Sequence, residues 1–308
     1  MASGQENGPA RPHVFIQANA KQWIGALVSA HSLRRASAHG DAFDVTILRQ
    51  EDYPVFRAND GRAYRRHGVA RTWRNDDLQS FTLLRFMPPR LMGYRGRALV
   101  IDPDVFAVGD VWELLNRDMA GKAILCRRSR FRNGAFATSV MLLDCARLAH
   151  WDVERGCGEL FALQRDYHDW VSLKLEPSAT IGPFEDEWND FDRLTAKTKM
   201  LHNTRRRTQP WKTGLKVDYT PTEFVPLIGR LMRLRRVLFG DHGLLGRYAR
   251  HPDHNQEAFF FGLLRECLEK GIIDEATLRH AMQRDHLRHD ALDVVARAPR
   301  LAGVGAAT

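Results

Sequence analysis

Two aspartates that follow an apolar run are the residues of this sequence best suited to chemistry. The run Ala98-Leu99-Val100-Ile101 leads into Asp102-Pro103-Asp104. Residues i and i+2 of an extended backbone point to the same side, so the two carboxylates can converge while the proline stiffens the turn. Carboxylate oxygens suit magnesium or manganese better than zinc. The pair is therefore a candidate cation site that could hold a diphosphate, and the alternative is a strand-ending turn capped by Asp.

The same spacing occurs a second time, at Asp190-Phe191-Asp192, directly after the polar run 185–189. A pattern that appears twice in one chain cannot identify a site without its context. In an open α/β sheet, ligands collect beyond the carboxyl ends of the strands, which is where Asp102 and Asp104 would lie. The strand context therefore favours the first copy.

A basic segment lies about 100 residues further on, at His202-Asn203-Thr204-Arg205-Arg206-Arg207-Thr208-Gln209-Pro210-Trp211-Lys212. The histidine could complete a metal site begun by two aspartates, and the arginines could neutralise phosphate oxygens by bidentate hydrogen bonds. The alternatives are a core histidine beside an exposed basic turn, or a nucleic-acid patch with Trp211 as a stacking surface.

A strand, a helix and a second strand open the chain and would position these residues. Val14–Ile16 reads as a buried strand that leads into the loop 17–21, and apolar residues then recur at helical spacing over 23–33. Alternation over 43–47 predicts the second strand. A βαβ opening implies a parallel sheet with a right-handed crossover, and a nucleotide would be met at the loop after the first strand.

Further along, strands are predicted at 123–126 and 139–143, and a helical stretch at 147–175. Residues 57–74 carry six arginines and read as a mobile basic surface insertion, either a lid over an anionic ligand or a solvated loop. Helices are predicted at 224–234, 259–268 and 275–282. The expected organisation is a disordered tail (1–12), an α/β domain (13–218), a C-terminal helical region (219–298) and a disordered tail (299–308).

The composition of the 308 residues, with 44% hydrophobic and 27% charged side chains, is that of an ordinary soluble globular protein. No segment approaches the ~18 consecutive apolar residues of a membrane span, and no secretory signal precedes the first strand, so a cytoplasmic protein is expected. The net charge of +9 favours an anionic partner: a nucleotide, a nucleic acid or an anionic membrane surface.

The opening strand and loop, the strand ending in Asp-x-Asp, and the distal His followed by Pro-Trp together resemble glycosyltransferases of the glycogenin and lipopolysaccharide galactosyltransferase type, glycosyltransferase family 8. The resemblance covers approximately residues 13 to 215. It implies the GT-A fold, a Rossmann-like mixed α/β sheet flanked by helices. It also implies a hexosyltransferase that takes its sugar from a nucleoside diphosphate sugar, expected to be a UDP-sugar. The resemblance further implies that the anomeric configuration of the sugar is retained.

Residue roles follow from the same resemblance. Asp102, Asp104 and His202 correspond to the ligands of Mn²⁺ or Mg²⁺, Arg85 to an arginine that touches the donor sugar, and Asp169 to the acidic residue beside it, with Asp166 as a rival on the same helix face. The positions assigned to the nucleotide are Ala18, Asn19, Lys21, Ile101, Thr138, Arg205, Arg207 and Lys212.

The sequence departs from the family pattern at two positions of the pocket. Ala137 replaces a sugar-binding asparagine, and Gln209 replaces a phosphate-binding lysine whose role would pass to Arg205, Arg207 or Lys212. The expected partners are a nucleotide sugar and a glycan, lipid or protein acceptor, with no nucleic acid and no membrane span; peripheral membrane contact stays open. The alternatives are a catalytically silent protein that binds a nucleotide sugar or a nucleic acid, and a nucleotidyltransferase, which the glycine-free loop 17–21 disfavours.

Overall fold

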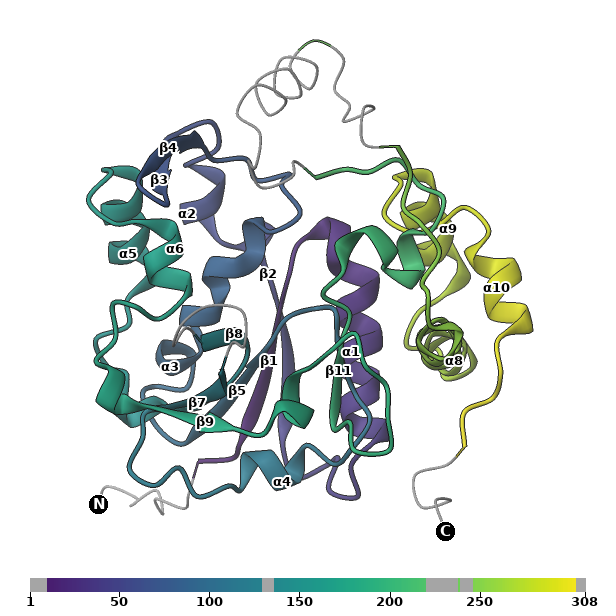
Figure 1. Ribbon diagram of the computed structural model, residues 1–308, viewed down its shortest axis with the longest axis horizontal. Helices are drawn as coiled ribbons and strands as arrows, with labels where there is room; N and C mark the ends of the chain where they lie inside the picture. Colours follow the sequence, from purple (N-terminus) through teal and green to yellow (C-terminus); the bar gives the residue numbers. More distant parts are fainter. Residues whose placement is uncertain (1–9, 129–135, 220–237, 239–245, 303–308) are drawn as a thin grey trace, which may run out of the picture. The chain divides into compact units, whose positions relative to one another are not determined.

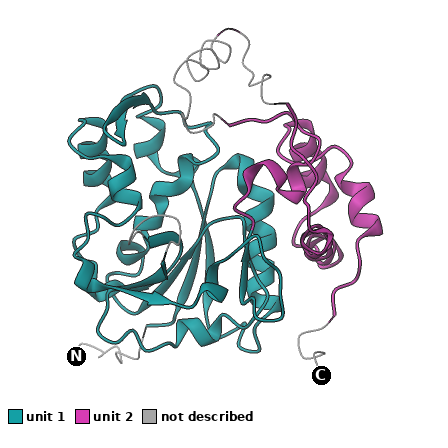
Figure 2. Cartoon of the chain, in the orientation of Figure 1, with its two compact units in different colours: residues 1–202 teal, residues 203–308 magenta. Residues whose placement is uncertain are grey.

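The computed structural model describes residues 10–128, 136–219, 238 and 246–302, and the chain forms two compact units, residues 1–202 and 203–308 (Figure 2). The predicted boundary after residue 218 differs from this division, since residues 203–219 belong to the second unit. The helix predicted at 224–234 lies outside the described residues, as do most of both predicted tails.

The first unit is built on a six-stranded mixed sheet of strand order β2-β1-β5-β8-β7-β9. β1 pairs in parallel with both β2 and β5, whereas β8 runs antiparallel to β5 and β7, and β9 is parallel to β7. The mixed α/β architecture and the βαβ opening are thereby confirmed. The strands are β1 (His13–Ala18), β2 (Asp44–Arg49), β5 (Arg97–Ile101), β7 (Ile124–Arg128), β8 (Phe136–Asp144) and β9 (Ile181–Phe184).

The centre of this sheet is apolar because it is covered on both faces. In β5, the four residues Ala98–Ile101 are at most 1% exposed. Figure 1 shows α1 running alongside the sheet as the crossover between β1 and β2. The described helices of this unit are α1 (Trp23–Arg35), α2 (Pro54–Arg57), α3 (Pro88–Leu91), α4 (Trp112–Leu115), α5 (Val153–Phe161) and α6 (Tyr167–Val171).

A second, three-stranded sheet of order β10-β11-β6 brings distant segments together. It consists of β6 (Val105–Ala107), β10 (Asp190–Phe191) and β11 (Met200–His202). β11 is antiparallel to β6, with His202 opposite Val105, and parallel to β10, with His202 opposite Phe191. This small sheet sets the histidine beside the turn that follows β5.

The basic segment 57–74 contains a β-hairpin that its sequence pattern did not predict. Strands β3 (Ala63–Arg66) and β4 (Val69–Thr72) pair antiparallel, and Tyr64 makes edge-to-face contacts with Trp73 at 5.5 Å and with Tyr167 at 5.7 Å. These aromatic contacts fix the hairpin to the unit. Arginines mask the aromatic positions in the sequence, which is why no apolar period is visible.

The predicted helical stretch 147–175 is interrupted between α5 and α6. Leu163 adopts a left-handed backbone conformation (φ +61°), and Asp166 then caps α6 by accepting a hydrogen bond from the His168 N–H at 2.8 Å. A new cap begins a new helix, so one continuous helix is the wrong prediction here.

The second unit contains α8 (His254–Glu269), α9 (Glu275–Gln283) and α10 (Ala291–Arg297). The first two confirm the predicted helices, and α10 was not predicted. Trp211 stacks on Phe260 of α8 with ring centroids 4.7 Å apart, which accounts for residues near 211 belonging to this unit. Within the described residues, no helix is long and apolar enough to cross a membrane.

Candidate metal centre

The Asp102-Pro103-Asp104 segment is a tight turn at the carboxyl end of β5. The Val105 N–H donates to the Asp102 carbonyl at 3.2 Å, and the Asp102 N–H donates to the Ser139 carbonyl of β8 at 2.9 Å. Both carboxylates therefore leave the sheet at the edge where an open α/β sheet binds its ligands. The segment is therefore a strand-ending turn, and the same geometry also allows the candidate cation site, so the two interpretations of the sequence do not exclude each other.

One face of α1 holds this turn in place through small side chains. A Cβ atom added to Gly25 would lie 2.8 Å from the Pro103 carbonyl oxygen, so helix and turn meet without room for a side chain. One turn later, the Ser29 hydroxyl donates to the Val105 carbonyl at 2.6 Å. Ser32 Oγ accepts from the Ala107 N–H at 2.9 Å. The backbone that carries Asp104 is thus fixed by α1.

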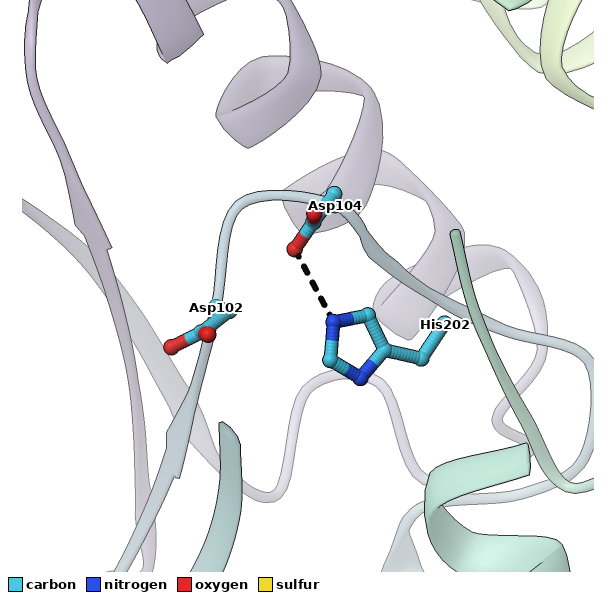
Figure 3. Close-up of side chains that lie close together, drawn as sticks. All are labelled: Asp102, Asp104 and His202. Carbon is cyan, nitrogen blue, oxygen red and sulfur yellow. Dashed lines mark ion pairs between the residues drawn. The ribbon is translucent and has the colours of Figure 1, made fainter. Parts of the chain in front are cut away.

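Asp102, Asp104 and His202 form one cluster, in which one ligand atom from each residue lies within 4.8 Å of the others. Figure 3 shows the Asp104 carboxylate and the His202 ring pointing toward one another, with Nε2 and Oδ1 separated by 3.3 Å. Among the described residues, this is the one group of three or more His, Cys, Asp or Glu side chains with such spacing.

The orientation of the His202 ring is set by Asn189. His202 Nδ1 lies 2.8 Å from Asn189 Oδ1, an acceptor, so Nδ1 carries a proton and the ring presents Nε2 toward Asp104. The Asn189 amide donates to Ser139 Oγ at 3.0 Å, and its backbone carbonyl accepts from Arg127. His202, Asn189, Ser139 and Arg127 are buried.

Asp102 is held from the other side by Arg85 and Gln17. Its Oδ1 accepts from Arg85 Nη2 at 3.0 Å and from the Gln17 amide. Arg85 also donates to Thr138 Oγ1, whose hydroxyl donates to the Val171 carbonyl at 2.7 Å. Both of these bonds to Asp102 end on Oδ1.

Burial and charge act against each other in this cluster. Burial raises the pKa of Asp102, as does the nearby Asp104 carboxylate, while the Arg85 guanidinium lowers it; the net direction is upward. Burial lowers the pKa of His202, but the charge and hydrogen bond of Asp104 outweigh it and raise the pKa above its ordinary value. Two partly buried carboxylates beside one buried guanidinium favour a further positive charge at this point.

The donor set fits a hard divalent cation. Two ligands at right angles on a cation with bonds of about 2.1 Å lie about 3 Å apart, close to the separation between Asp104 and His202. The two carboxylates suit Mn²⁺ or Mg²⁺, and the imidazole would add a third ligand, with the remaining positions open to water or phosphate oxygens. Asp102, Asp104 and His202 would hold the metal, as predicted from the sequence.

The competing copy at Asp190 and Asp192 has other roles. Asp190 is buried and accepts a hydrogen bond from Thr198 Oγ1 at 2.9 Å. The Asp192 backbone N–H donates to the His202 carbonyl at 2.9 Å. Phe191 lies between them, edge-to-face with the His202 ring at 5.4 Å. The second Asp-x-Asp therefore builds the strand that supports the histidine.

Four of the residues predicted to meet the nucleotide, namely Ala18, Asn19, Lys21 and Ile101, lie at or just after the ends of β1 and β5. Ile101 pairs with Ile16 in the parallel register, so Ala18, the last residue of β1, leaves the sheet at the same edge as Asp102. Asn19 is buried and its amide donates to the Asp77 carbonyl and to Ser80 Oγ, both at 3.0 Å. Lys21 follows in a short 3₁₀ turn.

Asp169, the predicted acidic residue beside the sugar, lies on α6 and pairs with Lys174 at 2.8 Å, with its side chain 41% exposed. Its rival Asp166 caps the same helix and accepts a hydrogen bond from the Gly68 N–H at 2.8 Å. That second bond ties α6 to the β3–β4 hairpin. No hydrogen bond or ion pair within the described part of the chain joins Asp169 to the Asp102 cluster.

Three residues predicted to bind phosphate belong to the second unit. Arg205 and Arg207 are exposed, and the Arg207 carbonyl accepts from the Ala249 N–H at 2.8 Å. Lys212 is fully buried, with its Nζ 3.2 Å from the Asp285 carbonyl and 3.5 Å from Asp218. Those contacts give Lys212 a structural role within its own unit.

Sequence reasoning did not identify Gln17, Gly25 and Asn189 as members of the site. Gln17 opens the predicted nucleotide loop. Its polar side chain directly after the apolar strand 14–16 is the feature of the sequence that could have indicated its role in the site. Asn189 directly precedes the second Asp-x-Asp, and the sequence around it gives no indication that its side chain contacts His202. Gly25 carries no chemistry, and only the closeness of α1 to Pro103 reveals its role.

Comparison with known proteins gives matches in structure. No protein-family model and no curated protein matches the sequence. The chain is similar to the glycosyltransferase GlyE of Streptococcus pneumoniae TIGR4 (16% identity, TM-score 0.48), covering 86% of this chain and 64% of GlyE. It is also similar to the galactosyltransferase LgtC in complex with donor and acceptor sugar analogs (12% identity, TM-score 0.45, 65% of this chain and 89% of LgtC). The chain spans less than two thirds of the length of GlyE.

Proposed function

We propose that this chain is a metal-dependent glycosyltransferase of the GT-A type, which moves a sugar from a nucleoside diphosphate sugar, UDP-linked, to a glycan, lipid or protein acceptor. The observation that carries the proposal is the convergence of Asp102, Asp104 and His202 at the carboxyl end of β5, beside the end of β1. A cation held there can bind a diphosphate while the residues after β1 contact the nucleoside.

The chemistry requires that negative charge on the departing nucleoside diphosphate be stabilised. A bound Mn²⁺ or Mg²⁺ would act as a Lewis acid toward those phosphate oxygens. The chain's own contribution is to fix the three ligands through Asn189, Arg85 and the α1 face, so that little reorganisation accompanies reaction. Arg85 already donates to Asp102 and Thr138 and is oriented at this edge of the sheet.

Retention of anomeric configuration is part of the proposal. Leaving group and acceptor would then share one face of the sugar, and the diphosphate could take the proton of the acceptor hydroxyl. No strong protein base is needed in such a reaction. Asp169 is the proposed acidic residue beside the transferred sugar, which requires its ion pair with Lys174 to open when donor binds.

The test measures the release of UDP from each of a panel of UDP-sugars. Each donor is assayed once with Mn²⁺ present and once with Mn²⁺ chelated. We expect turnover of at least one donor, abolished by chelation and by Asp104→Ala, and retained in Asp52→Ala, an exposed aspartate of the same unit. Turnover that survives Asp102→Ala, Asp104→Ala and His202→Ala would overturn the proposal. Metal-dependent donor binding without turnover, across a wide acceptor panel, would instead support the catalytically silent alternative.

A further inference from the structure

A separate cavity of about 440 Å³ lies within the second unit, between the first half of α8, the end of α10 and the loop before α10. All of its lining residues fall between 250 and 299, so the cavity is formed by this unit alone. Its volume is in the range of small-molecule sites, which span about 300–1,000 Å³. Neither the metal cluster nor the residues assigned to the nucleotide contribute to it.

One wall of the cavity is a rigid network of paired charges. Arg288 is bidentate to Asp290, with Nε to Oδ1 at 2.6 Å and Nη2 to Oδ2 at 2.9 Å, and its Nη1 donates to Glu257 at 2.7 Å. The other Glu257 oxygen accepts from Arg250 Nε at 3.3 Å. Two guanidinium groups and two carboxylates therefore neutralise one another, and they hold the wall in a fixed geometry.

A positive charge is left over at the rim. Arg297, in the last turn of α10, is exposed, and its side chain makes no hydrogen bond or ion pair among residues 10–128, 136–219 and 246–302. His254, the first residue of α8, also lines the cavity and is exposed. Since the carboxylates of the wall are already paired, the surplus charge of the lining is that of Arg297.

The rest of the lining is apolar. Ala258 and Phe261 of α8 face the cavity together with Val294 of α10 and Pro299. Phe261 is only 1% exposed, and the Arg288 guanidinium lies 5.6 Å from the centre of its ring. An occupant must therefore combine an apolar body with an anionic end.

We propose that this cavity binds a small amphipathic anion, whose single oxyanion group, a carboxylate or a phosphate monoester, pairs with Arg297 while its apolar body lies against Ala258, Phe261 and Val294. The inference stands independently of the proposed glycosyltransferase activity, because it uses no residue of the metal cluster. A cation is disfavoured, since Glu257 and Asp290 are already engaged by arginines.

The test is an NMR titration of the full chain with methyl-labelled valine and isoleucine, using four probes: hexyl phosphate, hexanoate, inorganic phosphate and hexylammonium. We expect hexyl phosphate or hexanoate to shift the Val294 methyls and leave the buried Ile273 unchanged. Whichever of the two binds more tightly identifies phosphate or carboxylate as the preferred group. Inorganic phosphate should bind more weakly, and hexylammonium should not bind.

Two variants separate a specific site from surface adsorption. Arg297→Gln removes an exposed charge and should weaken the anionic probe about tenfold, the effect of losing one charge-assisted contact. The matched control is Arg279→Gln on α9, an exposed arginine paired with Glu275, which should leave binding unchanged. Ala258→Trp fills the cavity and should abolish binding.

Three results would overturn the proposal: no Val294 shift with any probe, equal shifts with hexylammonium, or equal affinities for Arg297→Gln and Arg279→Gln. A circular dichroism melt of each variant shows that it is folded under the titration conditions. Because the readout is binding at Val294, loss of glycosyltransferase activity neither supports nor contradicts this site.

Discussion

The amide oxygen of Asn189 lies 2.8 Å from Nδ1 of His202 and thereby determines which ring nitrogen faces Asp104. An amide oxygen only accepts, so Nδ1 carries a proton, and Nε2 is the ring nitrogen that could offer a lone pair to a cation. Asn189 is itself fixed by Ser139 and Arg127. The geometry of the candidate metal cluster therefore depends on a buried residue that lies outside Asp102, Asp104 and His202.

Replacing Asn189 by Ala should weaken Mn²⁺ binding about 10- to 100-fold, the usual cost of losing a group that orients a metal ligand. The His202 ring would lose its fixed tautomer. Mn²⁺ affinity is measured from the electron paramagnetic resonance signal of the free ion. The matched control is Asn116→Ala, an exposed asparagine bonded to the Trp112 carbonyl. Equal affinities in the two variants would show that Asn189 has no orienting role.

Replacing Gly25 by Ala should destabilise the protein although alanine is the better helix former. The added Cβ would lie 2.8 Å from the Pro103 carbonyl, so α1 or the turn must move. We expect a loss of about 1–3 kcal/mol in the free energy of unfolding, together with weaker Mn²⁺ binding. Urea unfolding and the Mn²⁺ titration measure the two effects.

The control for this substitution is Gly158→Ala in α5, where an added Cβ meets nothing within 4 Å. That change should stabilise the protein by about 0.5–1 kcal/mol through helix propensity alone. If Gly25→Ala also stabilised the protein and left Mn²⁺ affinity intact, the close approach of α1 to the turn would not be required.

Replacing Arg85 by Lys should lower the free energy of unfolding by about 1–3 kcal/mol, because a lysine cannot bond Asp102 and Thr138 together and leaves a buried partner unsatisfied. The comparison is Arg90→Lys, whose arginine forms an exposed pair with Glu154 at 3.2 Å. That surface change should stay within about 0.5 kcal/mol. Similar values for both in urea unfolding would contradict the buried contacts described for Arg85.

Asp166 should make stability depend on pH in the acid range. Burial raises its pKa, but hydrogen bonds from the backbone N–H groups of Gly68 and His168 outweigh burial and lower the pKa below its ordinary value. The stabilisation is therefore complete above the unfolded-state pKa of about 3.9 and is lost as pH falls through the lower folded-state value.

The variant Asp166→Ala should accordingly lose about 0.5–2 kcal/mol at pH 7, the range for an N-cap. The gap to the unmodified protein should narrow below about pH 3, where the carboxylate is protonated in both states. Urea unfolding at a series of pH values measures this gap. A gap that stays constant, or widens toward acid, would show that the charge of Asp166 contributes nothing.

The sequence predicted those parts of the site that depend on strand ends. Asp102 and Asp104 follow an apolar strand, and the spacing of two residues places them on one side whatever lies around them. His202 was assigned as the third ligand by resemblance, and in the structure its ring lies 3.3 Å from Asp104. The βαβ opening followed from the alternating strand and helix patterns of β1, α1 and β2, whereas the mixed sheet was expected from the family resemblance.

What could not be predicted depends on contacts between distant segments. Asn189 reaches His202 only because β10 and β11 pair, and nothing local in either segment indicates that pairing. The β3–β4 hairpin is held by Tyr64 against Tyr167, about a hundred residues later, while its own sequence is dominated by arginine. Lys212 was assigned to phosphate by position, yet it is buried against Asp218 and Asp285.

The central claim, a metal-diphosphate site at Asp102, Asp104 and His202, is tested most directly by a Mn²⁺ titration of the protein with and without UDP. Electron paramagnetic resonance of the free ion measures the binding. We predict that each chain binds one Mn²⁺, and that it binds this ion more tightly when UDP is present because the metal and the diphosphate share the site. Mn²⁺ binding and its tightening by UDP should both be lost in Asp102→Ala, Asp104→Ala and His202→Ala. Both should be kept in Asp52→Ala. Unchanged Mn²⁺ binding in the three variants, or no effect of UDP on it, would contradict a metal-diphosphate site at Asp102, Asp104 and His202.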